Sequence, residues 1–209
     1  DKAILPGRPS GSVKSLYDEE PASVNQKYIE SSASVAMPIF EIGFKDNYLK
    51  KGDELLKREI AVELITRLLA GRSSKLFTEL YEKGLINDTF GTDNSTEAEF
   101  AFASFGGESE NPQEVKTRLM ETICQKRKSG FGTGEFERVK KAFYGTYLRG
   151  FNDVQTIGGM VTRYILSGIN IFSFSDIYNS VDLKYVTEVF NEIFTEDNMA
   201  MSVVLPSEK

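Results

Sequence analysis

The stretch Gly71–Ile86 reads Gly-Arg-Ser-Ser-Lys-Leu-Phe-Thr-Glu-Leu-Tyr-Glu-Lys-Gly-Leu-Ile. Its large apolar side chains recur with the spacing of one face of a short helix: Leu76, Phe77 and Leu80. Ser73 or Ser74 can accept hydrogen bonds from the free N–H groups at the start of that helix. The stretch therefore predicts a short, serine-capped helix, and the rest of the fold is read outward from it.

Upstream of this stretch, two further elements are expected. From Asp53 onward, apolar residues at steps of four predict a long helix that ends near Gly71. Before it, Val35–Phe44 is apolar on both alternating sets, which favours a strand covered on both faces. Pro38 lacks a ladder donor, so it belongs at an edge or bulge, or its nitrogen faces away from a partner.

Downstream, a hairpin and four more helices are expected. Ile86–Phe90 and Glu97–Phe105 read as its strands, joined by a turn at Thr92–Ser95. Asn111, followed by Pro112, starts the next helix. The remaining predictions are helices Glu135–Arg149, Asn152–Leu166 and Asp182–Phe194, with Asn152 and Asp182 as caps, and a last strand Met199–Leu205.

This order of elements predicts an α+β fold in two layers, with an antiparallel or mixed sheet and helices packed on one face. Residues 1–30 are a polar lead-in that resembles a linker, and residues 31–209 form a single domain. Because the chain opens on such a segment without an initiator methionine, we expect it to be a fragment of a longer protein.

Composition narrows the partners. The 209 residues carry a net charge of -6, which opposes binding to nucleic acid and to anionic membrane surfaces. No stretch is apolar enough to span a membrane. A single cysteine, Cys124, cannot form an internal disulfide, so the cytoplasm is the expected compartment. Its place beside Met120 and Ile123 predicts a buried, packing role for Cys124.

The chain contains no histidine, so imidazole is absent both as a metal ligand and as a catalytic base. With one cysteine and no imidazole it has no credible zinc site, and no base that could activate a serine or cysteine nucleophile. The acidic pairs Glu97/Glu99 and Glu108/Glu110 are more simply read as solvated carboxylates. We therefore predict no catalytic residue, no metal ligand and no cofactor in this chain.

The stretch resembles the insulinase/pitrilysin family of zinc metallopeptidases, in a bacterial subgroup, and specifically its non-catalytic C-terminal half. The positions that match the family pattern are mainly structural: Gly71, Ser73, Ser74, Leu76, Phe77, Leu80, Glu82 and Leu85. The resemblance implies a clamshell enzyme whose missing N-terminal homologous half holds zinc through His-x-x-Glu-His. The C-terminal half then closes over an extended peptide substrate.

In that family, an arginine and a tyrosine after the Ser-Ser helix bind substrate. Here the arginine position is Tyr81, and the tyrosine position falls at Asn87 or Asp88. Losing a cationic donor near an oxyanion costs on the order of 3 kcal/mol of transition-state stabilisation. We therefore expect a non-catalytic, substrate-enclosing domain of a zinc metallopeptidase-like protein, inactive alone. The alternative is a non-enzymatic scaffold or protein-interaction module of the same family.

Overall fold

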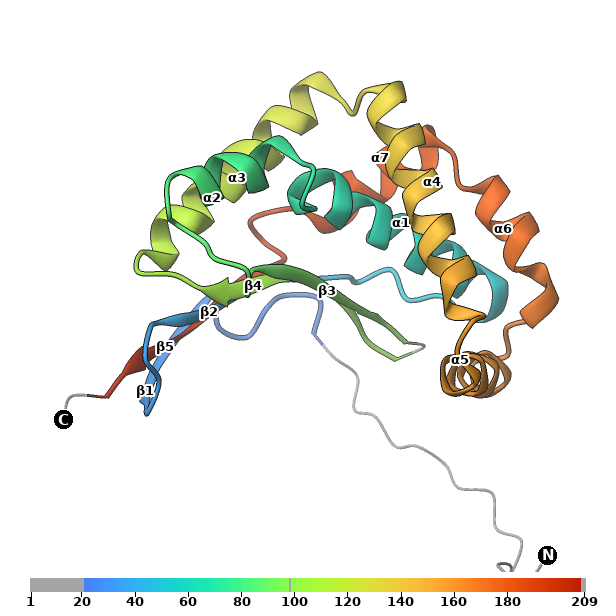
Figure 1. Cartoon of the computed structure of the whole chain (residues 1–209), viewed down its shortest axis with the longest axis horizontal. Helices are drawn as coiled ribbons and strands as arrows, with labels where there is room; N and C mark the ends of the chain where they lie inside the picture. The colour runs from blue at the N-terminus through green and yellow to red at the C-terminus, as the bar shows by residue number, and fades with distance from the viewer. Residues whose placement is uncertain (1–20, 98, 208–209) are drawn as a thin grey trace, which may run out of the picture.

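A computed structural model describes residues 21–97 and 99–207. The described chain folds into one five-stranded sheet with helices over one of its faces (Figure 1). The first 20 residues of the predicted lead-in lie outside the described residues. The first strand begins at Tyr28, two residues before the predicted end of the lead-in.

The sheet is mixed, with strand order β1-β5-β2-β4-β3. Edge strand β1, Tyr28–Ala33, is parallel to β5, Met199–Pro206. Strand β2, Ile39–Lys45, is antiparallel to both β5 and β4, Ala101–Glu108. Strand β3, Gly91–Thr96, pairs antiparallel with β4 and forms the other edge. The predicted α+β, mixed-sheet fold is confirmed.

Two strand predictions are wrong in detail. The segment Thr92–Ser95, expected to be a turn, is the body of β3, and Ile86–Phe90 precedes that strand. Polar side chains are tolerated in β3 because it lies at the edge of the sheet, and this polarity imitates a turn. Strand β2 begins after Pro38 and is buried on one face only: Phe40, Ile42 and Phe44 point inward while Glu41 is exposed.

The helices agree more closely with the sequence. Their bounds are α1 Gly52–Ala70, α2 Lys75–Glu82, α3 Pro112–Ser129, α4 Thr133–Gly150, α5 Val154–Leu166, α6 Phe174–Ser180 and α7 Leu183–Ile193, with a 3-10 turn at Ile171–Ser173. The predicted caps Asn111 and Asp182 accept backbone hydrogen bonds at the starts of α3 and α7. Helix α5 is capped by Asp153 instead of Asn152, and α6 was not predicted.

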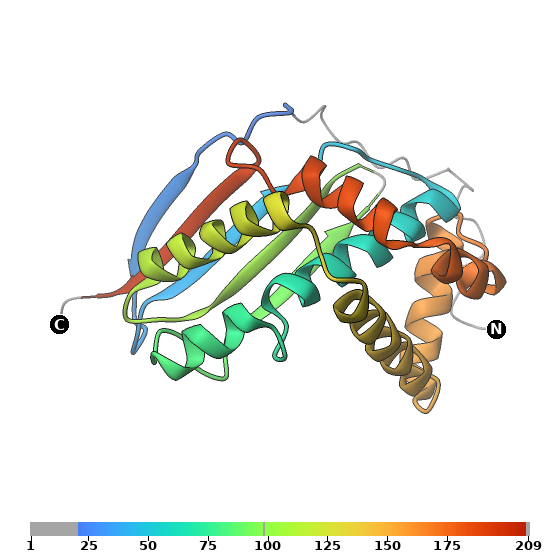
Figure 2. The same cartoon turned by 90° about the horizontal axis from the view of Figure 1, so that it is seen from above.

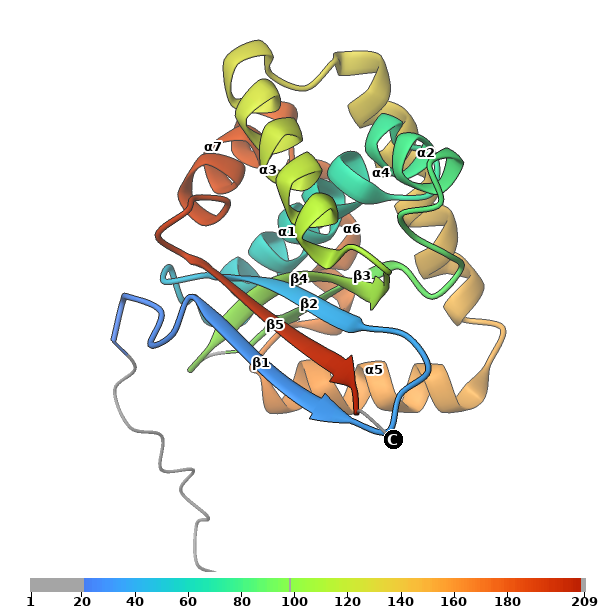
Figure 3. The same cartoon turned by 90° about the vertical axis from the view of Figure 1, so that its left-hand side faces the viewer.

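Helix α1 lies at the centre of the helical layer. Figures 2 and 3 show it above the strands, and it contacts α2, α3, α4, α6 and α7. The core between the layers is rich in phenylalanine: the ring of Phe44 lies 5.0 Å from that of Phe194 and 6.0 Å from that of Phe105. Helix α5 lies apart, beyond the end of the β3–β4 hairpin (Figure 1).

A buried ion pair fixes α1 to the end of β2. The guanidinium of Arg58 donates to both carboxylate oxygens of Asp46, at 2.6 and 2.7 Å, and to Glu192 of α7 at 2.8 Å. Burial alone would lower the pKa of Arg58, but the hydrogen bond and charge of Asp46 outweigh it and raise that pKa. The side chains of Arg58 and Asp46 are only 3% and 2% exposed, so each depends on the other.

The predicted burial of Cys124 is wrong. Its side chain is exposed on α3, whose buried stripe consists of Val115, Leu119 and Ile123. Cys124 follows Ile123 directly, and one residue is about 100° of rotation around a helix. That rotation moves the thiol out of the stripe.

Candidate functional site

Helix α2 is fixed at its start by the two serines. The Ser74 hydroxyl accepts from the backbone N–H of Phe77 at 3.1 Å, and Ser74 is buried. The neighbouring Ser73 hydroxyl accepts from the Arg138 guanidinium at 2.7 Å, which ties α2 to α4. Gly71 is required by a close approach: a Cβ there would lie 2.5 Å from the carbonyl oxygen of Arg67. The serines therefore act as positioning groups for the helix.

The residues Lys83-Gly84-Leu85 of the motif form the C-terminal cap of α2. Gly84 has a φ of +67°, a conformation that favours glycine. The Gly84 N–H donates to the carbonyl of Tyr81 at 3.0 Å, and the Leu85 N–H donates to that of Leu80 at 2.9 Å. These two bonds form a Schellman motif. The chain therefore reverses after Tyr81 and runs toward β3.

The remaining motif residues have plain structural positions. Leu76, Phe77 and Leu80 are buried in the core, and Leu85 packs against it. Glu82 is exposed at the end of α2.

Tyr81 and Asp88 are connected at the surface through Phe77 and Arg72. The Tyr81 ring is half exposed and stacks on Phe77, with 5.9 Å between centroids and an interplanar angle of 11°. The Arg72 guanidinium lies 5.7 Å from the same Phe77 ring and forms a 3.5 Å ion pair with Asp88. Sequence reasoning missed Arg72, although it stands inside the motif. We call Arg72, Phe77, Tyr81 and Asp88 the α2 cluster.

Asn87 has a different position. Its amide nitrogen donates to Glu108 at 2.9 Å, and its side-chain oxygen accepts from both the N–H and the hydroxyl of Thr89, at 2.9 and 2.6 Å. The Thr89 hydroxyl accepts in turn from the Glu108 N–H at 3.0 Å. The side chain of Asn87 thus stabilises the turn before β3, and its main hydrogen-bonding groups are already used.

The outer edge of β3 begins just after this turn. Within residues 21–97 and 99–207, β4 is the only strand paired with β3. Midway along β3, Asn94 donates to Glu63 of α1 at 2.5 Å. At the end of the strand, the carbonyl of Thr96 accepts from Arg163 of α5 at 3.4 Å. The edge therefore connects the α2 cluster at one end with α5 at the other.

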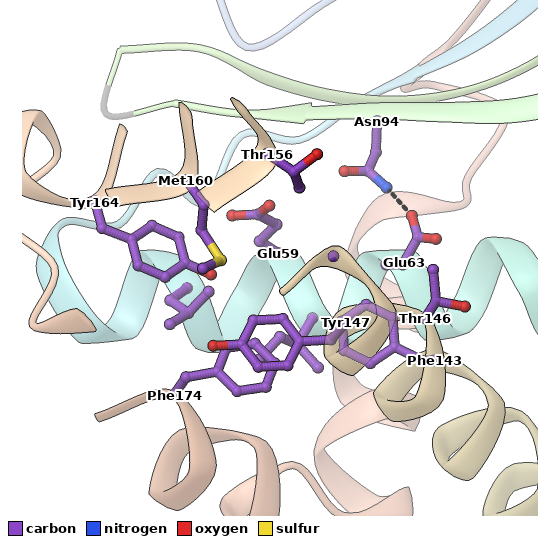
Figure 4. A pocket seen from close by; sticks show the side chains of 13 residues that line it. Glu59, Glu63, Asn94, Phe143, Thr146, Tyr147, Thr156, Met160, Tyr164 and Phe174 are labelled. Atoms are coloured by element: carbon purple, nitrogen blue, oxygen red, sulfur yellow. Dashed lines mark hydrogen bonds between the residues drawn. The ribbon is translucent and has the colours of Figure 1, made fainter. Parts of the chain in front are cut away.

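A cavity of about 260 Å³ lies at the α5 end of β3, bounded by α1, α4, α5 and α6 (Figure 4). Its lining is largely apolar and aromatic: Leu56, Ile60, Phe143, Tyr147, Met160, Tyr164 and Phe174. Burial, reinforced by the charge of Glu59, raises the pKa of the Tyr164 phenol. Burial likewise raises the pKa of Tyr147. Both phenols are therefore neutral at physiological pH.

Acidic side chains do not gather elsewhere in a way that would hold a metal. Across the described residues, no group of three or more histidine, cysteine, aspartate or glutamate side chains lies close enough to bind an ion. No helix among those residues is long and apolar enough to cross a membrane.

Comparison with known proteins identifies the family of this chain. Residues 6–143 match the family model of the peptidase M16 inactive domain. The chain therefore belongs to the peptidase M16 inactive domain family, which confirms the resemblance to the insulinase/pitrilysin zinc peptidases and their non-catalytic half.

Two of the similar proteins are longer than this chain. It is 30% identical over 190 residues to the uncharacterized zinc protease YmfH of Bacillus subtilis (strain 168), covering 90% of this chain and 44% of YmfH. An M16-like peptidase from Alicyclobacillus acidocaldarius superposes with a TM-score of 0.87 at 24% identity, covering 92% of this chain and 46% of that one. The chain spans less than half the length of these two relatives.

One similar structure consists of a single inactive domain. The inactive peptidase domain of a zinc protease from Bordetella parapertussis has a TM-score of 0.67 and 17% identity, covering 85% of this chain and 95% of that one. At this identity the likeness shows the fold alone.

Proposed function

We propose that this domain is the non-catalytic, substrate-enclosing half of a zinc metallopeptidase-like protein that acts on peptides. Zinc, in this proposal, is held by a homologous N-terminal half. The observation that carries the proposal is the edge of β3, which starts beside the α2 cluster and has β4 as its only partner strand in the described chain. Backbone groups at such an edge can bind an extended peptide with little dependence on its sequence.

Polar groups beside the edge supply further contacts. The Tyr81 hydroxyl has no hydrogen-bond partner among the described residues, so it is available to a peptide carbonyl or N–H. Asp88 and Arg72 are 80% and 69% exposed, so both can contact a peptide end while they remain paired with each other. Asn87 contributes indirectly, by holding the turn that presents Asp88.

The net charge of -6 argues against nucleic acid and anionic membranes as partners, and the single cysteine favours the cytoplasm.

The proposal is tested by a peptide-binding assay in which fluorescence anisotropy reports binding. A labelled, extended peptide should bind the 209-residue chain, and Tyr81→Phe should weaken binding about fivefold, the effect of losing one hydrogen bond of ~1 kcal/mol. Tyr28→Phe is the matched control, because Tyr28 lies on the opposite edge strand of the sheet. Absence of binding, or equal losses in both variants, would refute the proposal.

The second candidate is a non-enzymatic scaffold that binds a partner protein without cutting it. Two observations favour it: Tyr81 is uncharged at the position of the family arginine, and Asn87 is committed to its own turn. The two candidates differ in the full-length protein. Chelator-sensitive cleavage of a bound peptide supports the peptidase half, whereas binding with no cleavage supports the scaffold.

A further inference from the structure

The cavity beside β3 has the form of a side-chain pocket. Tyr147 of α4 and Phe174 of α6 form one wall, with ring centroids 3.5 Å apart and an interplanar angle of 6°. Met160 and Tyr164 of α5 line the opposite side, as Figure 4 shows. Helix α1 and the three later helices α4, α5 and α6 thus bring apolar side chains to one cavity.

The charged groups in the cavity already have partners. Both carboxylate oxygens of Glu59 accept from the Arg163 guanidinium at 2.8 Å. Glu63 accepts from Arg67 at 2.6 Å and from Asn94 at 2.5 Å. Each of these two glutamates is already paired with an arginine. A charged ligand would therefore find no unpaired opposite charge in the cavity. The cavity favours an apolar guest instead.

Size sets the second limit. An apolar cavity of roughly 150 Å³ is enough to bind benzene, whereas sites for whole cofactors and drug-sized ligands span about 300–1,000 Å³. This cavity, at about 260 Å³, holds one large side chain with some room to spare. Its volume lies below the usual range for a complete cofactor.

The position of Asn94 indicates where that side chain comes from. Asn94 lies on edge strand β3, lines the cavity, and points toward the helical layer, where it bonds to Glu63. Two residues directly opposite each other on neighbouring strands have their Cβ atoms about 4.5–5.5 Å apart, on the same face of the sheet. A peptide residue opposite Asn94 would therefore direct its side chain toward the cavity.

We infer that this cavity is a specificity pocket that receives one large apolar side chain, such as phenylalanine or leucine, of an extended peptide bound along β3. The inference rests on the proposed function, because it requires a peptide at that edge. It adds a preference that backbone pairing alone does not provide.

The experiment compares labelled host peptides of threonine and serine that carry Phe, Leu, Trp or Ala at one central position. Their binding to the 209-residue chain is measured by anisotropy. We expect the Phe and Leu peptides to bind at least tenfold more tightly than the Ala peptide. Free N-acetyl-phenylalanine amide is measured in parallel, as a competitor.

Three variants connect the preference to the cavity. Thr156→Phe adds bulk to the lining and should reduce the Phe-to-Ala affinity ratio to near one. Ile165→Phe makes the same kind of addition on α5, at a side chain 68% exposed and outside the lining, and should leave the ratio unchanged. Met160→Ala enlarges the cavity and should raise the Trp-to-Leu ratio at least threefold. Circular dichroism checks that each variant is folded.

The outcomes separate the two proposals. If the host peptides bind but Phe, Leu and Ala are equivalent, the pocket is refuted and the proposed function survives. If the preference exists but Thr156→Phe and Ile165→Phe affect it equally, the pocket lies elsewhere and the inference is wrong. If the free phenylalanine derivative binds as tightly as the Phe peptide, the cavity is a small-molecule site. If no peptide binds, both proposals fall.

Discussion

Helices α1 and α5 both carry apolar residues at helical spacing, but they are packed in opposite ways. Helix α1 buries 12 of its 19 residues, with the sheet on one side and α4, α6 and α7 on others. Helix α5 buries only Tyr164 among its 13 residues. Its apolar residues Val154, Ile165 and Leu166 are 82%, 68% and 83% exposed. Apolar spacing therefore predicts a helix in both cases, but it does not tell whether the helix has its partner within the chain.

The ion pairs of the two helices extend the contrast. Arg58 of α1 and its partner Asp46 are almost fully buried, whereas the side chains of Arg163 of α5 and its partner Glu59 of α1 are 37% and 22% exposed. The two pairs have similar bidentate geometry. Stability measurements on matched substitutions can therefore separate burial from geometry.

The largest effect is expected from Arg58→Ala. Removing one member of a buried pair leaves the other charge unpaired and costs about 3–5 kcal/mol of unfolding free energy. Arg163→Ala is the matched change in α5, and solvent screening should limit its cost to about 1 kcal/mol. Urea denaturation followed by circular dichroism measures both. Similar losses from the two variants would contradict the assigned difference in burial.

The next effect comes from a pair of leucines. Leu64 of α1 is fully buried, and Leu64→Ala should lower the unfolding free energy by roughly 3 kcal/mol, through lost burial and the cavity left behind. Leu166→Ala removes the same atoms from the exposed end of α5 and should change stability by less than about 0.5 kcal/mol. A loss above ~1.5 kcal/mol for Leu166→Ala would show that α5 is covered in solution.

Two glycines should respond with opposite signs. Gly84→Ala places a Cβ at a φ of +67° and should destabilise the chain by about 1 kcal/mol. Gly158→Ala on α5 meets no atom within 4 Å and should stabilise by roughly 0.5–1 kcal/mol, because alanine has the higher helix propensity. Thermal unfolding of the two variants measures the signs. A destabilising Gly158→Ala would reveal close packing against that face.

Sequence reasoning predicted the elements that carry their own local signals. Helix α1 is predicted by apolar residues at steps of four, and α3 by the cap Asn111 before Pro112. The short helix α2 was recognised by its serine cap and apolar spacing. Such elements are specified by neighbours in the chain, so their patterns survive without knowledge of the tertiary structure.

The edge strands β1 and β3 were not predicted from the sequence, because tertiary context determines them. All six residues of β1 are exposed, and β3 is the polar stretch Gly-Thr-Asp-Asn-Ser-Thr, so neither shows an apolar alternation. The cavity beside β3 was not predicted for a similar reason. Asn94 meets Glu63 across 31 residues, and Arg163 meets Glu59 across 104. No spacing rule connects positions so far apart, and only the fold brings them together.

Cys124 gives the smallest and most direct test of this limit. Cys124 is the residue directly after buried Ile123, so the question is which side of α3 faces the core. The native thiol should react with Ellman's reagent at a rate close to that of the urea-unfolded chain, and Cys124→Ser should change stability by less than about 0.5 kcal/mol. Protection of the native thiol by a hundredfold or more would mean that the stripe of α3 is rotated, with Cys124 inside. Truncation of Ile123, of the same kind as Leu64→Ala, would then show whether Ile123 has left the core, because consecutive helical residues can both be buried, as Leu55 and Leu56 are in α1.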